Sequence, residues 1–231
     1  MKQRPISFSD TMVEAILADR KTMTRRPKRI QPSDYEKEVQ LKIIPTLTST
    51  YTVSPSDYGH VGDQLWVKET YYQFGHWERD GLTKKGNPKW KFVPYDQNIR
   101  YAEDAPTSFK KSRSKSAPEV NFWYKRLARF MPQKYARIIL EITELREERL
   151  QDISEQDAIM EGIYKYEEGK IDDKEAYFDE WIGCYKDYLD IENACENPID
   201  SFMTLWNSIY GEDSWNKNQV VNVIGFKVIK K

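Results

Sequence analysis

The sequence predicts an α+β fold, because stretches with strand and helix periodicity are mixed along one chain. Strand candidates lie at 64–70, 136–150 and 220–229, and apolar and polar residues alternate strictly in the second half of the long candidate at 136–150. Apolar residues recur at helical spacing at 10–21, 154–162 and 197–211. With 231 residues the chain can bury a real core, and it has no internal repeats. We therefore expect one α+β domain over residues 1–231.

The first elements are a short strand and an amphipathic helix. Residues 6–8 favour a strand, and Ser9 is a typical helix N-cap. Val13, Ile16 and Leu17 follow at helical spacing, so we expect the helix to end near Lys21. The β-branched threonines that come next favour an extended exit.

The later elements have clear start and stop signals. A Gly62-Asp63 turn leads into the strand at 64–70. Ser154 begins a helix that Gly162 ends, and Asn197-Pro198 begins another that ends at Gly211. The last strand follows at 220–229.

Three segments lack such regularity, and we interpret them as insertions at about 27–57, 72–128 and 164–197. The first is rich in Pro, Ser and Thr and predicts a hairpin through 39–44 and 47–53. Residues 72–118 predict a long surface excursion with little core of its own. In the third insertion, aromatic residues on one stripe predict an amphipathic helix over 174–189.

Charge is strongly segregated along the chain. The net charge is -1 and the pI is near 6.2, which argues against a generic polyanion binder. Residues 110–137 nevertheless carry nine cations and one acid, interleaved with aromatic residues, whereas 167–196 is acidic. The basic stretch predicts either a nucleic-acid contact or a loop that pairs with the acidic insertion.

The sequence gives no sign of a metal site, a cofactor or a membrane segment. Two cysteines form no CxxC pair, and two histidines cannot build a histidine-rich metal site. A carboxylate-bound Mg²⁺ is the alternative that this leaves open. No apolar run approaches the ~18 residues that span a bilayer. We therefore expect a cytoplasmic protein without a cofactor or a membrane partner.

Residues 19–26 read Asp-Arg-Lys-Thr-Met-Thr-Arg-Arg and combine a hydroxyl, an amine and three guanidinium groups. A threonine becomes a nucleophile when a base takes its proton, and neighbouring cations lower the pKa of a lysine toward that role. The alternative is a solvated basic helix end.

Four motifs in order resemble the ASCH domain family. They are Arg20-Lys21-Thr22-x-Thr24, Gly62-Asp63-x-Leu65-Trp66-Val67, Leu150-Gln151-Asp152-Ile153-Ser154-Glu155 and Val223-Ile224-Gly225-Phe226-Lys227. The pattern is most similar to a large branch associated with phages and prophages. The resemblance covers residues 4–26, 58–71, 129–163 and 198–229. It implies a PUA-like fold, which is a small closed or nearly closed β-barrel flanked by helices.

The resemblance also implies a chemistry. Some small ASCH proteins are amidohydrolases that remove the acyl group of N4-acetylcytidine with a Lys, a Thr three residues later and a distant Glu. Lys21, Thr24 and Glu161 match these positions. In this chain Asp19 stands where such proteins usually have Gly. Asp tolerates a left-handed turn, so the fold survives, but the direction of Lys21 is less closely fixed.

The implied ligand is a modified cytosine nucleoside or an RNA or DNA base. A non-catalytic module that binds nucleic acid or a modified base is the alternative function, and a phage accessory protein without catalysis is a third. Trp66 is one of the binding candidates, but a tryptophan at strand spacing is also typical of a core residue. The candidate binding residues are Arg20, Arg25, Arg26, Trp66, Glu69, Lys110, Lys111, Arg126 and Arg129.

Overall fold

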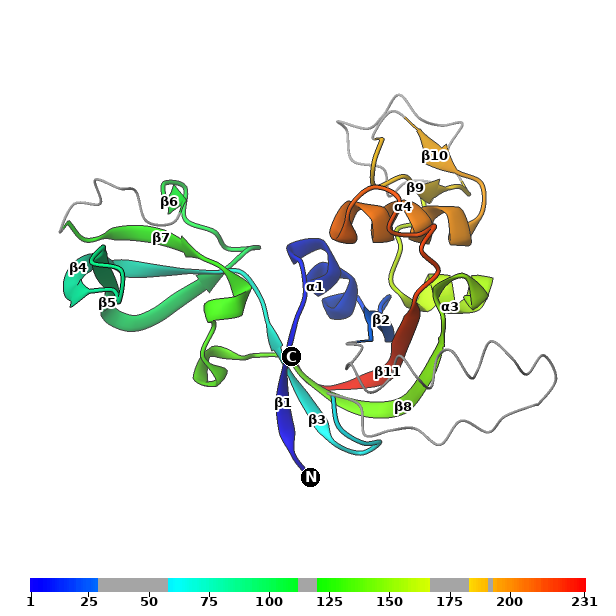
Figure 1. Ribbon diagram of the computed structural model, residues 1–231, viewed down its shortest axis with the longest axis horizontal. Coiled ribbons are helices and arrows are strands. Elements are labelled where there is room, and N and C mark those ends of the chain that lie inside the picture. The colour runs from blue at the N-terminus through cyan, green and yellow to red at the C-terminus, as the bar shows by residue number, and fades with distance from the viewer. Residues whose placement is uncertain (29–57, 112–119, 167–182, 191–192) are drawn as a thin grey trace. The chain divides into compact units, whose positions relative to one another are not determined.

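The computed structural model describes residues 1–28, 58–111, 120–166, 183–190 and 193–231. Its α+β character agrees with the sequence, because strands dominate and three α-helices accompany them in the described residues (Figure 1). The predicted hairpin at 39–53 lies outside these residues. No described helix is long and apolar enough to cross a membrane.

One sheet has five strands in the hydrogen-bonded order β1-β3-β8-β11-β2. The described strands include no pair between β1 and β2, so the expected closed barrel is not seen in this sheet. Its strands are β1 (Gln3–Ser7), β2 (Met23–Pro27), β3 (Gln64–Lys68), β8 (Ile139–Arg149) and β11 (Val220–Lys230).

Contacts divide the chain into two compact units. The described parts of 1–2, 15–64 and 141–228 form the first unit. The second comprises 3–14, 65–140 and 229–231. Helix α1 (Asp10–Leu17) begins in the second unit, and its last turn belongs to the first.

The first unit packs α3 (Glu155–Met160) against α4 (Pro198–Tyr210). Both helices begin as the sequence predicts. The Ser154 side chain accepts from the backbone N–H of Asp157, and Asn197 accepts from that of Asp200. Helix α4 buries Phe202, Leu205 and Trp206, each at most 5% exposed. This apolar face forms the core of the unit.

The predicted helix at 174–189 is wrong where the structure describes it. Residues 183–190 contain β9 (Tyr185–Lys186), which pairs with β10 (Ala194–Cys195), and residues 174–182 lie outside the described part. Gly183 has a φ of +93°, a left-handed conformation that interrupts a helix. Strand pairing and this glycine override the helical spacing of the aromatic residues.

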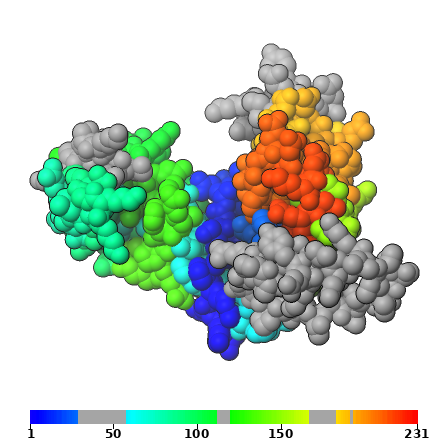
Figure 2. Space-filling model, viewed as in Figure 1, coloured from blue at the N-terminus to red at the C-terminus, as the bar shows by residue number. Residues whose placement is uncertain are grey.

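The second unit contains a four-stranded sheet in the order β5-β4-β7-β6. The strands are β4 (Tyr71–Leu82), β5 (Pro88–Tyr101), β6 (Lys110–Lys111) and β7 (Phe122–Arg126). The expected surface excursion thus forms regular strands, while the expectation of little core agrees with the burial, because only four of the described residues between 72 and 111 are buried. Figure 2 shows its described atoms packed together, coloured cyan to green. Buried Tyr71 and Tyr124 belong to its core.

Candidate functional site

Lys21 is positioned by the tight exit from α1. The backbone N–H groups of Arg20 and Lys21 both donate to the carbonyl oxygen of Ala15, at 2.9 and 3.1 Å. Asp19 has a φ of +57°, a left-handed conformation that Asp adopts more readily than most residues. The chain can therefore turn directly from the helix into β2 without glycine at this point.

Glu161 is positioned by the end of α3. It is the C-cap residue of the helix, and Gly162 follows with a φ of +82°. A Cβ atom on residue 162 would lie 2.6 Å from the Cβ of Lys21 and 3.0 Å from that of Ala15. Glycine is needed at 162 both for the backbone conformation and for this close approach.

Lys21 and Glu161 form a direct ion pair although 140 residues separate them in the chain. The Lys21 Nζ donates to Glu161 Oε2 at 2.8 Å and to the Glu161 carbonyl oxygen at 2.6 Å. Lys21 is 2% exposed and Glu161 is 3% exposed. Arg20 adds a hydrogen bond to the carbonyl oxygen of Gly162 at 3.2 Å, so two consecutive cations contact the end of α3.

Burial lowers the pKa of the Lys21 ammonium. The carboxylate of Glu161 opposes this shift, and the positive charges of Arg26 and Arg25 add to it. The net effect brings the amine closer to its neutral form than an exposed lysine. A neutral amine can accept a proton, which is the chemistry that a general base requires.

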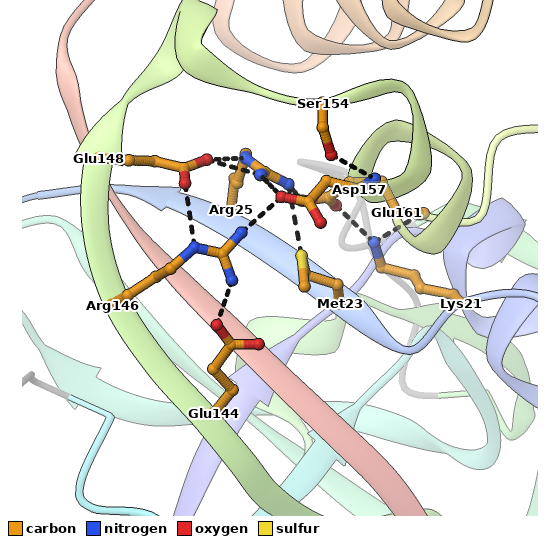
Figure 3. A network of polar contacts seen from close by, with 9 residues as sticks. All are labelled: Lys21, Met23, Arg25, Glu144, Arg146, Glu148, Ser154, Asp157 and Glu161. Carbon is orange, nitrogen blue, oxygen red and sulfur yellow. Dashed lines mark hydrogen bonds and ion pairs between the residues drawn. The ribbon is translucent and has the colours of Figure 1, made fainter.

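Arg25 connects this pair to a larger network that runs from buried to half-exposed side chains (Figure 3). Its guanidinium donates to Glu161 Oε1 at 3.3 Å, to Asp157 Oδ2 at 2.6 Å and to Glu148 Oε1 at 2.5 Å. Arg146 contacts Glu148, Asp157 and Glu144 from the other end of the network. Three cations thus face four carboxylates. The same contacts tie β2 to α3 and β8, which is the structural alternative to a catalytic role.

Thr24 is also buried, at 3% exposure. It lies between Met23 and Arg25 in β2, and side chains alternate between the two faces of a strand. Because Arg25 reaches Glu161 from one face, we infer that the Thr24 side chain leaves from the other. No hydrogen bond of its hydroxyl to Lys21 or Glu161 occurs in the described residues.

Two predicted binding residues of the second unit are held by their neighbours. Glu69 is 2% exposed and accepts two hydrogen bonds from Arg137, at 3.0 and 2.8 Å. Desolvation raises the pKa of this carboxyl, while Arg137 opposes the shift. Trp66 is 9% exposed, and the ammonium of Lys68 lies 5.6 Å from its ring centroid.

The remaining predicted cations differ in their surroundings. In the four-stranded sheet, the Lys110 ammonium lies 5.1 Å from the ring centroid of Phe122, while Lys111 is exposed. The Arg126 guanidinium lies 4.4 Å from the ring of Phe92. Arg129 is exposed, and its guanidinium lies 5.0 Å from the ring of Phe130. Arg26, in β2, is half-buried.

Sequence reasoning did not identify the residues that surround Arg25 in the ionic network or those that surround Arg126 in the four-stranded sheet. Glu144, Arg146 and Glu148 occupy alternate positions of β8, a pattern of opposite charges on one face that could have indicated an ionic network. Trp77 and Phe92 are paired across β4 and β5, and only the hairpin brings them together.

The described residues include no cluster of three or more His, Cys, Asp or Glu side chains suited to a metal ion.

Comparisons with known proteins give one structural relative. No protein-family model matches the chain, and neither does any curated protein. Among solved structures, the chain is similar to the ASCH domain from Lactobacillus crispatus JV V101, with 13% sequence identity and a TM-score of 0.32. The match covers 100% of this chain and 81% of that chain.

Proposed function

We propose that this ASCH-type chain hydrolyses the exocyclic amide of an N4-acylated cytosine nucleoside or base, with Lys21 and Glu161 as its acid-base pair. The observation that carries the proposal is the buried Lys21–Glu161 contact, in which a lysine with a lowered pKa donates to a carboxylate at 2.8 Å. Burial makes the neutral amine of this lysine more accessible than that of an exposed lysine, and a neutral amine can act as a base.

In the proposed reaction the neutral amine of Lys21 takes the proton of the attacking hydroxyl. The Thr24 oxygen then bonds to the acyl carbon, and the C–N bond to the cytosine breaks as the 4-amino nitrogen receives a proton. Water next hydrolyses the acyl-threonine ester, with Glu161 as the base, and releases the carboxylic acid.

The role of Thr24 rests on its spacing from Lys21, as the family resemblance implies. Arg20 or Arg26 would stabilise the oxyanion.

The test is release of cytidine from N4-acetylcytidine by the wild type and by variants that preserve shape. Thr24→Val removes the hydroxyl at nearly constant volume, and Thr22→Val is its matched control because Thr22 is an exposed neighbour in the same segment. We expect Thr24→Val to lose most activity and Thr22→Val to keep it. Full turnover by a folded Thr24→Val protein would exclude the threonine nucleophile.

The acid-base pair needs a variant that does not leave one charge buried alone. Lys21→Met combined with Glu161→Gln removes both charges, and replacing a whole buried pair is tolerated far better than breaking it. We expect this double variant to fold and to be inactive. Its loss should not exceed that of the more damaging single change, because residues that act as one unit have non-additive effects.

A non-catalytic module that binds a modified base or RNA is the second candidate. It is favoured by the position of Thr24, whose hydroxyl has no hydrogen bond to Lys21 or Glu161 in the described chain. Binding of N4-acetylcytidine without cytidine release would support it. The proposal also includes the finer expectations of the resemblance, namely the phage and prophage branch, a PUA-like barrel and a cytoplasmic location.

A further inference from the structure

The four-stranded sheet of the second unit gathers aromatic rings around one arginine. The Arg126 guanidinium carbon lies 4.4 Å from the ring centroid of Phe92 and 4.9 Å from that of Trp77. These two rings and the ring of Tyr124 lie 5.3 to 6.3 Å apart in edge-to-face geometry. Cations at such distances are attracted to the faces of the rings. The cluster is thus a preformed aromatic and cationic surface.

Strand register explains why these residues meet. Trp77 pairs with Phe92 across β4 and β5, and Tyr71 pairs with Arg126 across β4 and β7. Because Tyr71 and Trp77 occupy odd positions of β4, their partners on both sides point to the same face. Arg79 pairs with Trp90 on this face as well, and its guanidinium lies 5.8 Å from that ring. The pattern therefore extends along the sheet.

A hollow of about 570 Å³ opens beside this cluster. That volume lies within the range of protein pockets that hold a small ring-containing ligand. The residues that line it include three cations and no carboxylate. They are Trp77, Trp90, Phe92, Lys125, Arg126, Leu127, Arg129 and Phe130. The lining therefore suits an anionic ligand that also carries flat rings.

The rim of the hollow is open to a ligand. Phe130 is 58% exposed, and Arg129 beside it is exposed too. An exposed phenyl ring with a guanidinium 5.0 Å from its centroid offers one face for stacking and one charge for a phosphate. Such large exposed aromatic residues commonly mark a contact surface.

Two hydrogen-bond donors in this lining lack partners. The Arg126 Nε and the Trp77 Nε1 are buried atoms without a hydrogen-bond partner in the described structure. A buried donor that stays unpaired costs free energy, so each such group needs an explanation. Both atoms are shielded from solvent, so an acceptor on a ligand reaches them only after the two side chains rearrange.

We propose that this hollow is a binding site for single-stranded nucleic acid. An unpaired base would stack on the rings of Phe130 and Trp77, and the phosphates would contact Arg129 and also Lys125, whose ammonium lies 3.7 Å from Asp10. A single strand is favoured over a duplex because only unpaired bases offer their faces to aromatic side chains. The site uses none of the residues of the proposed hydrolytic reaction, so the two proposals stand or fall separately.

The test is fluorescence anisotropy of labelled oligouridylate and oligothymidylate of about twelve nucleotides, titrated with the full chain at several salt concentrations. We expect binding that weakens with salt by a log–log slope of roughly 0.7 for each phosphate contact. A double variant, Arg129→Ala with Phe130→Ala, should bind roughly tenfold more weakly or worse and show a smaller salt slope. The RNA and DNA arms decide which strand is preferred.

The matched control is Leu82→Ala with Lys85→Ala, which removes one exposed apolar and one exposed cationic side chain at the far end of β4. Thermal melting should show all three proteins folded, because the substituted side chains are exposed. Wild-type-like binding by the Arg129 and Phe130 variant would overturn the proposal. So would no anisotropy change at low salt, or equal affinity for a blunt duplex of the same length.

Discussion

Two regions of this protein use cations in opposite ways. In the network around Lys21, Arg25 is 3% exposed, and its guanidinium contacts three carboxylates. In the four-stranded sheet, Arg126 lies over two aromatic rings, and the hollow beside it has no carboxylate in its lining. The first region neutralises its charges internally, whereas in the second Arg126 lies over rings and only Lys125 among the lining cations has an ion pair in the described residues, with Asp10 at 3.7 Å.

The difference matters for function because an internally paired charge is unavailable to a ligand unless a proton moves. Lys21 and Glu161 already satisfy each other, so chemistry there depends on proton transfer and on the lowered pKa of the lysine. A cation on a ring remains attractive to an anion, since the ring contributes no formal charge. The two regions thus suit catalysis and binding, respectively.

The largest loss of unfolding free energy is expected from a substitution of Glu161. Glu161→Ala leaves Lys21 and Arg25 without one of their carboxylates in a buried place, which costs about 3–5 kcal/mol of unfolding free energy. Urea unfolding monitored by tryptophan fluorescence measures this loss. Glu144→Ala is the control, because the Glu144 side chain is 47% exposed and such a pair contributes about 0–1 kcal/mol. Equal effects of the two changes would contradict a buried network.

Gly162→Ala should have the next largest effect. The left-handed backbone alone costs roughly 1 kcal/mol or more for alanine, and the new Cβ would also approach the Cβ of Lys21 to 2.6 Å. Gly86→Ala is a matched control, since Gly86 has a φ of +76° and no atom within 4 Å of its added Cβ. Thermal unfolding of both variants separates the contact from the backbone strain. A Gly162→Ala protein as stable as Gly86→Ala would show that the approach to Lys21 is not tight.

Arg126→Leu should cost less, because it removes cation–π contacts of about 0.5–2 kcal/mol and leaves no charge behind. The expected loss is therefore smaller than that of Glu161→Ala, although both residues touch several neighbours. Arg79→Leu serves as the control, since Arg79 is exposed and lies farther from its ring, at 5.8 Å. Denaturant midpoints give the ranking, and a larger loss for Arg126→Leu than for Glu161→Ala would reverse the comparison.

The smallest effect is expected in the alkaline pH dependence of stability. The folded protein lowers the pKa of Lys21 below its ordinary value of 10.5, so between these two values the unfolded chain binds more protons. The free energy of unfolding should therefore rise with pH between the lowered pKa and 10.5, relative to that of a Lys21→Met variant. This gain should be lost as the pH falls through the lowered pKa. Denaturant midpoints of both proteins across this range measure it, and parallel curves would be inconsistent with a shifted pKa.

Local signals in the sequence predicted much of the fold. Caps such as Ser154 and Asn197, and helix ends such as Gly162 and Gly211, lie where the structure has them, because these residues act within a few positions of themselves. The strands at 64–70, 136–150 and 220–229 were also predicted, although burial alternates only in the first half of β8, while β3 and much of β11 are buried on both faces.

Long-range pairing was beyond such reasoning. The four-stranded sheet was missed because the pairing of β4 with β5 is irregular, with register shifts between Gln73 and Gly75 and between Arg79 and Leu82. In the candidate site, the contact of Lys21 with Glu161 was expected only from the family resemblance. The roles of Glu148 and Asp157 toward Arg25 were not expected, because more than a hundred residues separate them from it.

The edges of the four-stranded sheet also bear on how the protein avoids self-association. Edge strands offer free backbone groups on which a second chain can add, and lysine, proline and short strand length discourage this. Among the described strands, β6 has only two residues, Lys110 and Lys111, and β5 carries Pro88 and Pro94. These borders disfavour the addition of a second chain to the sheet.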